Sequence, residues 1–118
     1  MASTNRKEQR SNQRIPSDLR LRTAEGDGLI EMQVANVSLG GAYCRSPRPI
    51  EPMTRMEVIL ELPSADGVTP VRTEAVVVRA ERASTGSQNP TYHLALWFQG
   101  MSEEHRTSLM HYLGTYEH

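Results

Sequence analysis

The central feature of the sequence is residues 36–41, Asn36-Val37-Ser38-Leu39-Gly40-Gly41, which separate two runs of alternating apolar and polar residues. Alternation of this kind is typical of a half-buried strand, so the stretch joins the end of one strand to the start of the next. On an extended chain Asn36 and Ser38 would point to one face and Val37 to the other. The two glycines would allow a positive-φ turn and a close approach to the backbone. Taken alone, these residue types also fit an ordinary loop.

Alternating runs on both sides of this stretch predict six short strands. They cover residues 18–24, 29–37, 42–45, 56–62, 71–82 and 91–99. The first two are separated by Glu25-Gly26-Asp27-Gly28, which is a turn sequence, and are expected to form a hairpin. The continuous run Val76-Val77-Val78 is typical of a strand covered on both sides.

From Ser102 onward the apolar period changes to that of a helix. Ser102 is a suitable N-cap, and two acidic residues follow it in the first turn, where the helix dipole favours them. The apolar stripe consists of Leu109, Leu113 and Tyr116, and the helix is expected to end near Gly114. The fold class is therefore mainly β. We expect a six-stranded antiparallel β-barrel of the split-barrel kind, with the C-terminal helix covering an opening or edge.

The N-terminal residues 1–14 carry no apolar side chain beyond Met1 and Ala2, so we expect them to form a flexible arm before a folded domain of residues 15–114. Residues 1–22 hold six basic and two acidic side chains, a net charge of +4. Because the whole chain has a net charge of −1, the remainder carries −5. A basic arm on an acidic body favours an anionic partner for the arm and argues against a broad nucleic-acid-binding face.

Several function classes find no support in the sequence. There is no phosphate-binding or dinucleotide-binding glycine motif, no nucleophile elbow, and no His/Cys spacing typical of zinc, so we expect neither an enzyme nor a metal protein. The single cysteine, Cys44, allows no intrachain disulfide. No apolar run approaches the ~20 residues of a membrane span, and the N-terminus lacks the apolar core of a signal peptide. These features predict a cytoplasmic protein without membrane insertion.

Two short elements, taken together, resemble the PilZ domain family, the bacterial receptors for cyclic di-GMP. They are Arg10-Ser11-Asn12-Gln13-Arg14, an Arg-x-x-x-Arg element before the first strand, and residues 36–41, an Asn-x-Ser-x-x-Gly element after the second. Arg6-Lys7-Glu8-Gln9-Arg10 also satisfies the first pattern. We prefer the pair Arg10 and Arg14 because Ile15-Pro16 and the first strand follow directly, as in the family.

The resemblance implies a ligand site and a role for each of its residues. A guanidinium can bind a phosphate or a guanine edge bidentately and can stack on a purine, which suits Arg10 and Arg14. The other implied residues are Asn36 and Ser38 for hydrogen bonds to the guanine, Gly40 and Gly41 for close approach, and Arg79 and Gln9 as further contacts. The arm would then close over the ligand and change the surface offered to an effector protein that is not yet identified.

Two alternative functions stay open at this stage. The first is a PilZ-like adaptor that binds no nucleotide and acts only through protein contacts. The second is a small barrel that binds single-stranded nucleic acid, which would need aromatic stacking platforms beside the basic residues. None of the aromatic residues interleaves with the basic arm, so we expect no nucleic-acid partner.

Overall fold

The structure is a computed structural model that describes residues 15–25, 28–65, 67–83 and 91–115. The expected arm of residues 1–14, including Arg10 and Arg14, lies outside these residues, as do Gln9 and Tyr116.

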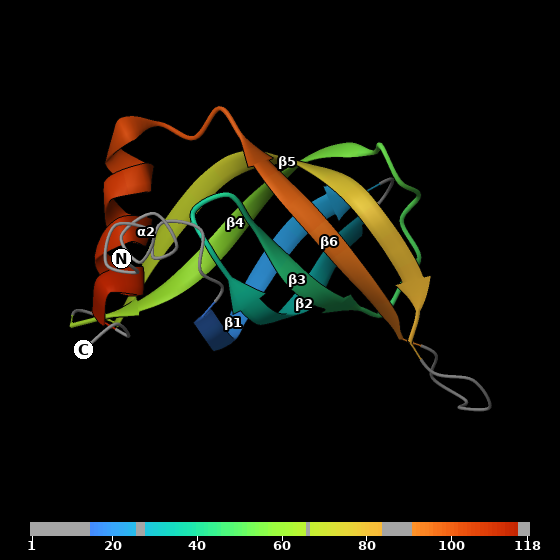
Figure 1. The fold of residues 1–118 in the computed structure, drawn as a ribbon, viewed down its shortest axis with the longest axis horizontal. Helices are drawn as coiled ribbons and strands as arrows, with labels where there is room; N and C mark the ends of the chain where they lie inside the picture. The colour runs from blue at the N-terminus through green and yellow to red at the C-terminus, as the bar shows by residue number, and fades with distance from the viewer. Residues whose placement is uncertain (1–14, 26–27, 66, 84–90, 116–118) are drawn as a thin grey trace, which may run out of the picture.

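Six strands and one helix make up the described residues (Figure 1). The elements are β1 (Ile15–Glu25), β2 (Gly28–Val37), β3 (Gly41–Ser46), β4 (Arg55–Ser64), β5 (Gly67–Arg82), β6 (Tyr92–Gln99) and α2 (Glu103–Thr115). All six predicted strands and the predicted helix are confirmed. Most of their bounds differ from the prediction by three residues or fewer; β5 starts four residues earlier, at Gly67.

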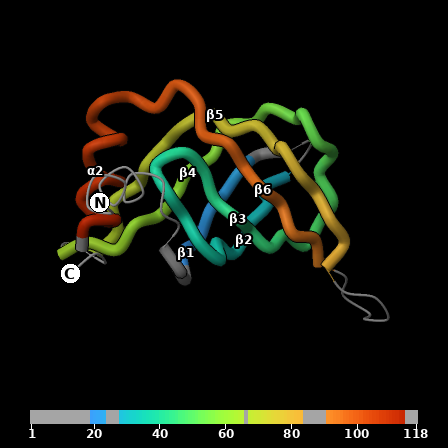
Figure 2. Tube along the Cα trace, in the orientation of Figure 1, coloured from blue at the N-terminus to red at the C-terminus, as the bar shows by residue number. Residues whose placement is uncertain are grey.

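The strands form a closed antiparallel barrel in the order β1-β2-β3-β6-β5-β4, and β4 pairs with β1 to complete the ring. After β3 the chain continues to β4, which pairs with β1 and not with β3. The last strand, β6, then fills the place between β3 and β5, as the Cα trace shows (Figure 2). The predicted six-stranded barrel with a C-terminal helix is thus confirmed. Strands that are distant in sequence consequently become neighbours on one wall.

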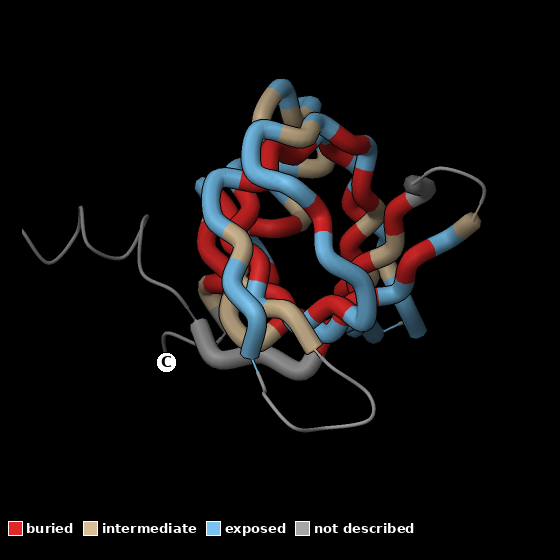
Figure 3. The backbone as a smooth tube through the Cα atoms, turned by 90° about the vertical axis from the view of Figure 1, so that its right-hand side faces the viewer, coloured by how far each residue is buried: buried red, intermediate tan, exposed pale blue. Residues whose placement is uncertain are grey.

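Side chains alternate between the barrel interior and its outer wall, as the period of two in the sequence requires. Seen from the end opposite α2, buried and exposed positions alternate along the ring of strands (Figure 3). The interior holds fully buried aliphatic side chains such as Leu21, Val58 and Leu96. In the valine run, Val76 and Val77 are buried but Val78 is 43% exposed. The prediction that both faces of the strand are covered along this run therefore holds for Val76 and Val77 only.

Helix α2 stands at one end of the barrel and contributes to the same core (Figure 1). Its buried residues are Leu109, Tyr112 and Leu113. Ser102 caps the helix, because its Oγ accepts a hydrogen bond from the His105 N–H at 3.2 Å. The His105 imidazole lies 3.0 Å from both the backbone N and O of Arg72, which ties the first turn of α2 to β5. No helix in the described part of the chain is long and apolar enough to cross a membrane.

Candidate functional site

The residues of the Asn-x-Ser-x-x-Gly element form a tight turn between β2 and β3. The backbone N–H of Ser38 donates to the Gly41 carbonyl at 2.8 Å. The Ser38 hydroxyl accepts from the Gly40 N–H at 3.2 Å and donates to the Gly41 carbonyl at 3.4 Å. Because Ser38 is only 5% exposed, its described hydrogen bonds hold the turn together.

Of the two roles predicted for the glycine pair, a positive-φ turn and a close approach to the backbone, the structure shows only the second. Neither Gly40 nor Gly41 has a positive φ, so the prediction of a positive-φ turn at this pair is wrong. Gly41 is needed for close approach, because a Cβ there would clash with the backbone oxygen of Leu96 on β6. Gly40 is exposed with open space around it, and its carbonyl accepts a hydrogen bond from the Phe98 N–H at 2.9 Å.

Asn36 and Arg79 lie on the same outer wall of the barrel although they are far apart in the sequence. The register places Asn36 opposite Tyr43, Tyr43 opposite Ala95, and Ala95 opposite Arg79, which forms one row across β2, β3, β6 and β5. Both ends of this row follow a register shift, between Val34 and Asn36 and between Val77 and Arg79. Such bulges redirect side chains and are common beside binding sites.

A hollow of about 310 Å³ lies over this row. Its lining residues are Ala35, Asn36, Tyr43, Cys44, Arg45, Arg79, Glu81, His93 and Ala95. The second row, Arg45–His93–Glu81, runs beside the first one. The small side chain of Ala95 leaves room at the centre, and the polar side chains at the rim offer hydrogen-bond donors and acceptors.

Two arginines at this hollow differ from Arg20, Arg22 and Arg55 of the outer wall, which pair with carboxylates. Arg22, for example, pairs with Glu61 at 2.8 Å, and Arg20 pairs with Glu31 at 3.6 Å. Arg45 and Arg79, in contrast, make no ion pair with any residue that the structure describes. Guanidinium groups with no internal carboxylate partner remain available for an anionic ligand.

The entry of the chain into the barrel lies beside the same turn. In the pairing of β1 with β2, Ile15 is opposite Val37 and Pro16 is opposite Asn36. Arg14 immediately precedes Ile15 in the sequence, so the predicted arm is joined to the fold next to Asn36 and Ser38. Of the predicted site residues, the structure therefore brings Asn36 and Arg79 to one hollow and places the turn of Ser38, Gly40 and Gly41 at its edge.

The sequence analysis missed Tyr43, Arg45 and His93, which also line the hollow. Their alternation along β3 and β6 predicts that they face outward, but not which strands become neighbours. Among the described residues, no group of three or more His, Cys, Asp or Glu side chains could hold a metal ion.

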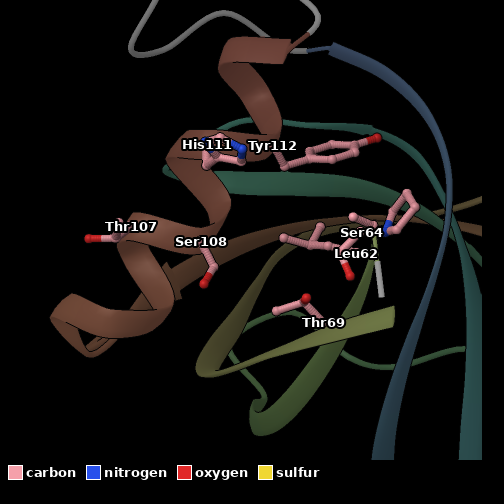
Figure 4. Close-up of a pocket in the computed structure, with 9 residues that line it drawn as sticks. Leu62, Ser64, Thr69, Thr107, Ser108, His111 and Tyr112 are labelled. Atoms are coloured by element: carbon pink, nitrogen blue, oxygen red, sulfur yellow. The ribbon is translucent and has the colours of Figure 1, made fainter. Parts of the chain in front are cut away.

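A larger hollow, of about 690 Å³, lies between α2 and the β4–β5 hairpin (Figure 4). Among the residues that the structure describes, it is lined by Leu62, Pro63, Ser64, Ala65, Thr69, Thr107, Ser108, His111 and Tyr112, and none of these is an arginine or a lysine. Figure 4 shows His111 and Tyr112 on the helix facing the hairpin side chains. Because this lining offers hydroxyl groups and apolar surface but no permanent positive charge, it suits a phosphate ligand less well than the Asn36–Arg79 hollow does.

Comparison with solved structures finds the same fold in several chains, including those of three proteins. The Bacillus subtilis inhibitor of motility (MotI/DgrA) has a TM-score of 0.73 and 18% identity, over 88% of this chain and 49% of the other. This chain thus spans about half the length of that protein. The PilZ domain of YcgR from Escherichia coli, solved with c-di-GMP, has a TM-score of 0.61 and 14% identity, over 84% of this chain and 82% of the other.

The third structure is the PilZ domain of CeSA from a cellulose synthesizing bacterium. It has a TM-score of 0.60 and 17% identity, over 90% of this chain and 99% of the other. Comparison with curated protein sequences finds no match to this chain. The family model of the PilZ domain, however, matches residues 6–114, which include the arm arginines, the turn and the whole barrel. The chain therefore belongs to the PilZ domain family.

Proposed function

We propose that this chain is a receptor for cyclic di-GMP that binds its ligand between the arginines of the N-terminal arm and the outer wall at Asn36 and Arg79. The observation that carries the proposal is the pairing of Ile15 with Val37, which joins the arm to the fold beside the Asn36–Gly41 turn. A ligand on the wall would thus lie within reach of Arg10 and Arg14. The PilZ domain of YcgR, which has the same fold, was solved with c-di-GMP, and this supports the ligand class.

Each part of the proposed site has a chemical task. Arg10 and Arg14 bind the phosphates and the guanine edges through bidentate hydrogen bonds. Asn36 supplies an amide group, which can donate and accept hydrogen bonds, toward a guanine, and Arg79 adds a positive charge without an ion-pair partner among the described residues. Ser38 and Gly41 act by holding the turn in the shape that places Asn36.

The proposed output is a change of surface and not a chemical reaction. We expect an arm whose only apolar side chains are Met1 and Ala2 to become ordered when the ligand supplies the missing contacts. Closure of the arm over the wall then alters the face that an effector protein meets. The effector stays unidentified, and catalysis plays no part in this mechanism.

The test is calorimetric titration of the full chain with cyclic di-GMP. We expect saturable binding by the wild type and at least about tenfold weaker binding by Arg14→Ala, because a lost charged hydrogen bond costs about 1.5–3 kcal/mol. Arg106→Ala, which removes an exposed arginine from α2, is the matched control and should bind like the wild type. A wild type that releases no heat of binding would leave the protein-only adaptor as the better explanation.

A further inference from the structure

Trp97 is the only tryptophan in the sequence, and it is 58% exposed on the outer wall of β6. Large aromatic side chains usually bury most of their surface, because each can remove a large apolar area from water. An indole left this open therefore needs a reason.

The burial of its neighbours indicates how the indole lies. Three residues that face outward by strand alternation are nevertheless buried, namely Gly41, Val76 and Ala95. Gly41 and Val76 are the cross-strand partners of Trp97 on either side, and Ala95 precedes it by two positions on the same face. Val76 and Ala95 are not members of the core cluster, so outer-wall residues cover them.

An indole that lies flat across this wall would account for the burial of Val76 and Ala95, whereas Gly41 lies against the backbone of Leu96. Gly41 has no side chain and Ala95 has a small one, so the wall beside Trp97 is level. In that orientation one face of the ring would rest on the wall and the other would stay open to solvent, as the 58% exposure of Trp97 allows. A flat, exposed aromatic face is the geometry on which a base can stack.

The position of Trp97 relative to the proposed site indicates which ligand would stack on it. The pair Gly41–Trp97 is two register steps from the pair Tyr43–Ala95, which lines the Asn36–Arg79 hollow. Gly41 also closes the turn that positions Asn36. We propose that Trp97 is the stacking platform for one guanine base of cyclic di-GMP, an inference that rests on the proposed function.

This assignment divides the recognition of the ligand into two kinds of contact. The arginines read charge and hydrogen-bonding edges, and salt weakens their attraction. Stacking on Trp97 reads the size of the aromatic face and depends little on salt. A purine offers a larger face than a pyrimidine, so Trp97 would favour purine cyclic dinucleotides over pyrimidine ones.

The test uses the lone tryptophan as its own reporter, with the full chain and cyclic di-GMP as the probe. Emission from Trp97 should change along the same binding curve that calorimetry gives. Trp97→Ala should bind about ten- to a hundredfold more weakly, the range that loss of one base stack produces, and the loss should persist at 0.5 M salt (a chosen test condition, roughly threefold above physiological ionic strength). Trp97→Phe keeps an aromatic face and should recover most of the affinity.

Leu29→Ala is the matched control, because Leu29 is another large apolar residue, 72% exposed, and lies at the opposite end of β2 from Asn36. It should bind like the wild type. If the wild type binds with normal heat but emission stays constant and Trp97→Ala keeps full affinity, the platform is refuted while the receptor function stands. The same outcome is expected of a tryptophan exposed for a protein partner. If the wild type gives no heat at all, the receptor function fails and the platform fails with it.

Discussion

At the scale of single residues, the two adjacent glycines of the motif make a sharp contrast. A methyl group at Gly41 would meet the Leu96 carbonyl, whereas a methyl group at Gly40 would meet nothing within 4 Å. We expect Gly41→Ala to lower the free energy of unfolding by about 1–3 kcal/mol, as overpacking against backbone usually does. Gly40→Ala should change it by less than about 0.5 kcal/mol. Urea unfolding of the two variants measures both values, and equal losses would contradict the close-approach role of Gly41.

The same pair shows what the sequence can and cannot predict about a residue. Two glycines in a turn predict that a side chain at one of these positions would destabilise the fold, and the structure indicates this for Gly41. Of the two predicted reasons, close approach is correct at Gly41 and the positive φ is wrong, because the constraint is the distance from β3 to β6. That distance depends on which strand lies beside β3, and the order of strands is a property of the closed barrel.

At the scale of an element, the packing of helix α2 against the end of the barrel is expected to contribute to the stability of the fold. Leu109 is fully buried in the core, and the next residue, Met110, is 50% exposed. We expect Leu109→Ala to reduce the free energy of unfolding by about 2–5 kcal/mol, because the loss combines transfer and cavity terms. Met110→Ala, on the exposed flank of the buried stripe, should cost less than about 0.5 kcal/mol. A small effect of Leu109→Ala in urea unfolding would mean that α2 is only loosely attached.

The elements themselves could be predicted well from the sequence because their periodicity is local. Alternation predicted the strands, and the Ser102 cap with the later apolar stripe predicted α2. The two bulges beside Asn36 and Arg79 could not be predicted. A bulge is a mismatch between two paired strands, so no single stretch of sequence contains its signal.

At the scale of the whole molecule, the candidate site exists because the barrel closes. Residues from β2, β3, β5 and β6 meet in one hollow only after β6 has entered between β3 and β5. Asn36 and Arg79 could be named from the family resemblance, while Tyr43, Arg45 and His93 depended on the strand register. A shift of one residue in that register would turn every one of these side chains to the other face.

The joining of arm and barrel leads to a prediction about the stability of the whole chain. A ligand that binds only the folded state at a concentration of 100 times its Kd stabilises that state by about 2.7 kcal/mol. We therefore expect cyclic di-GMP to raise the melting temperature of the wild type. The double variant Arg10→Ala/Arg14→Ala should melt like the unliganded wild type, because the substitutions lie outside the barrel, but should lose most of the ligand-induced rise. Arg48→Ala, an exposed arginine outside the proposed site, is the control and should keep the full rise. A double variant that still gains the full stabilisation would mean that the wall binds the ligand without the arm, and the closing arm would have to be abandoned.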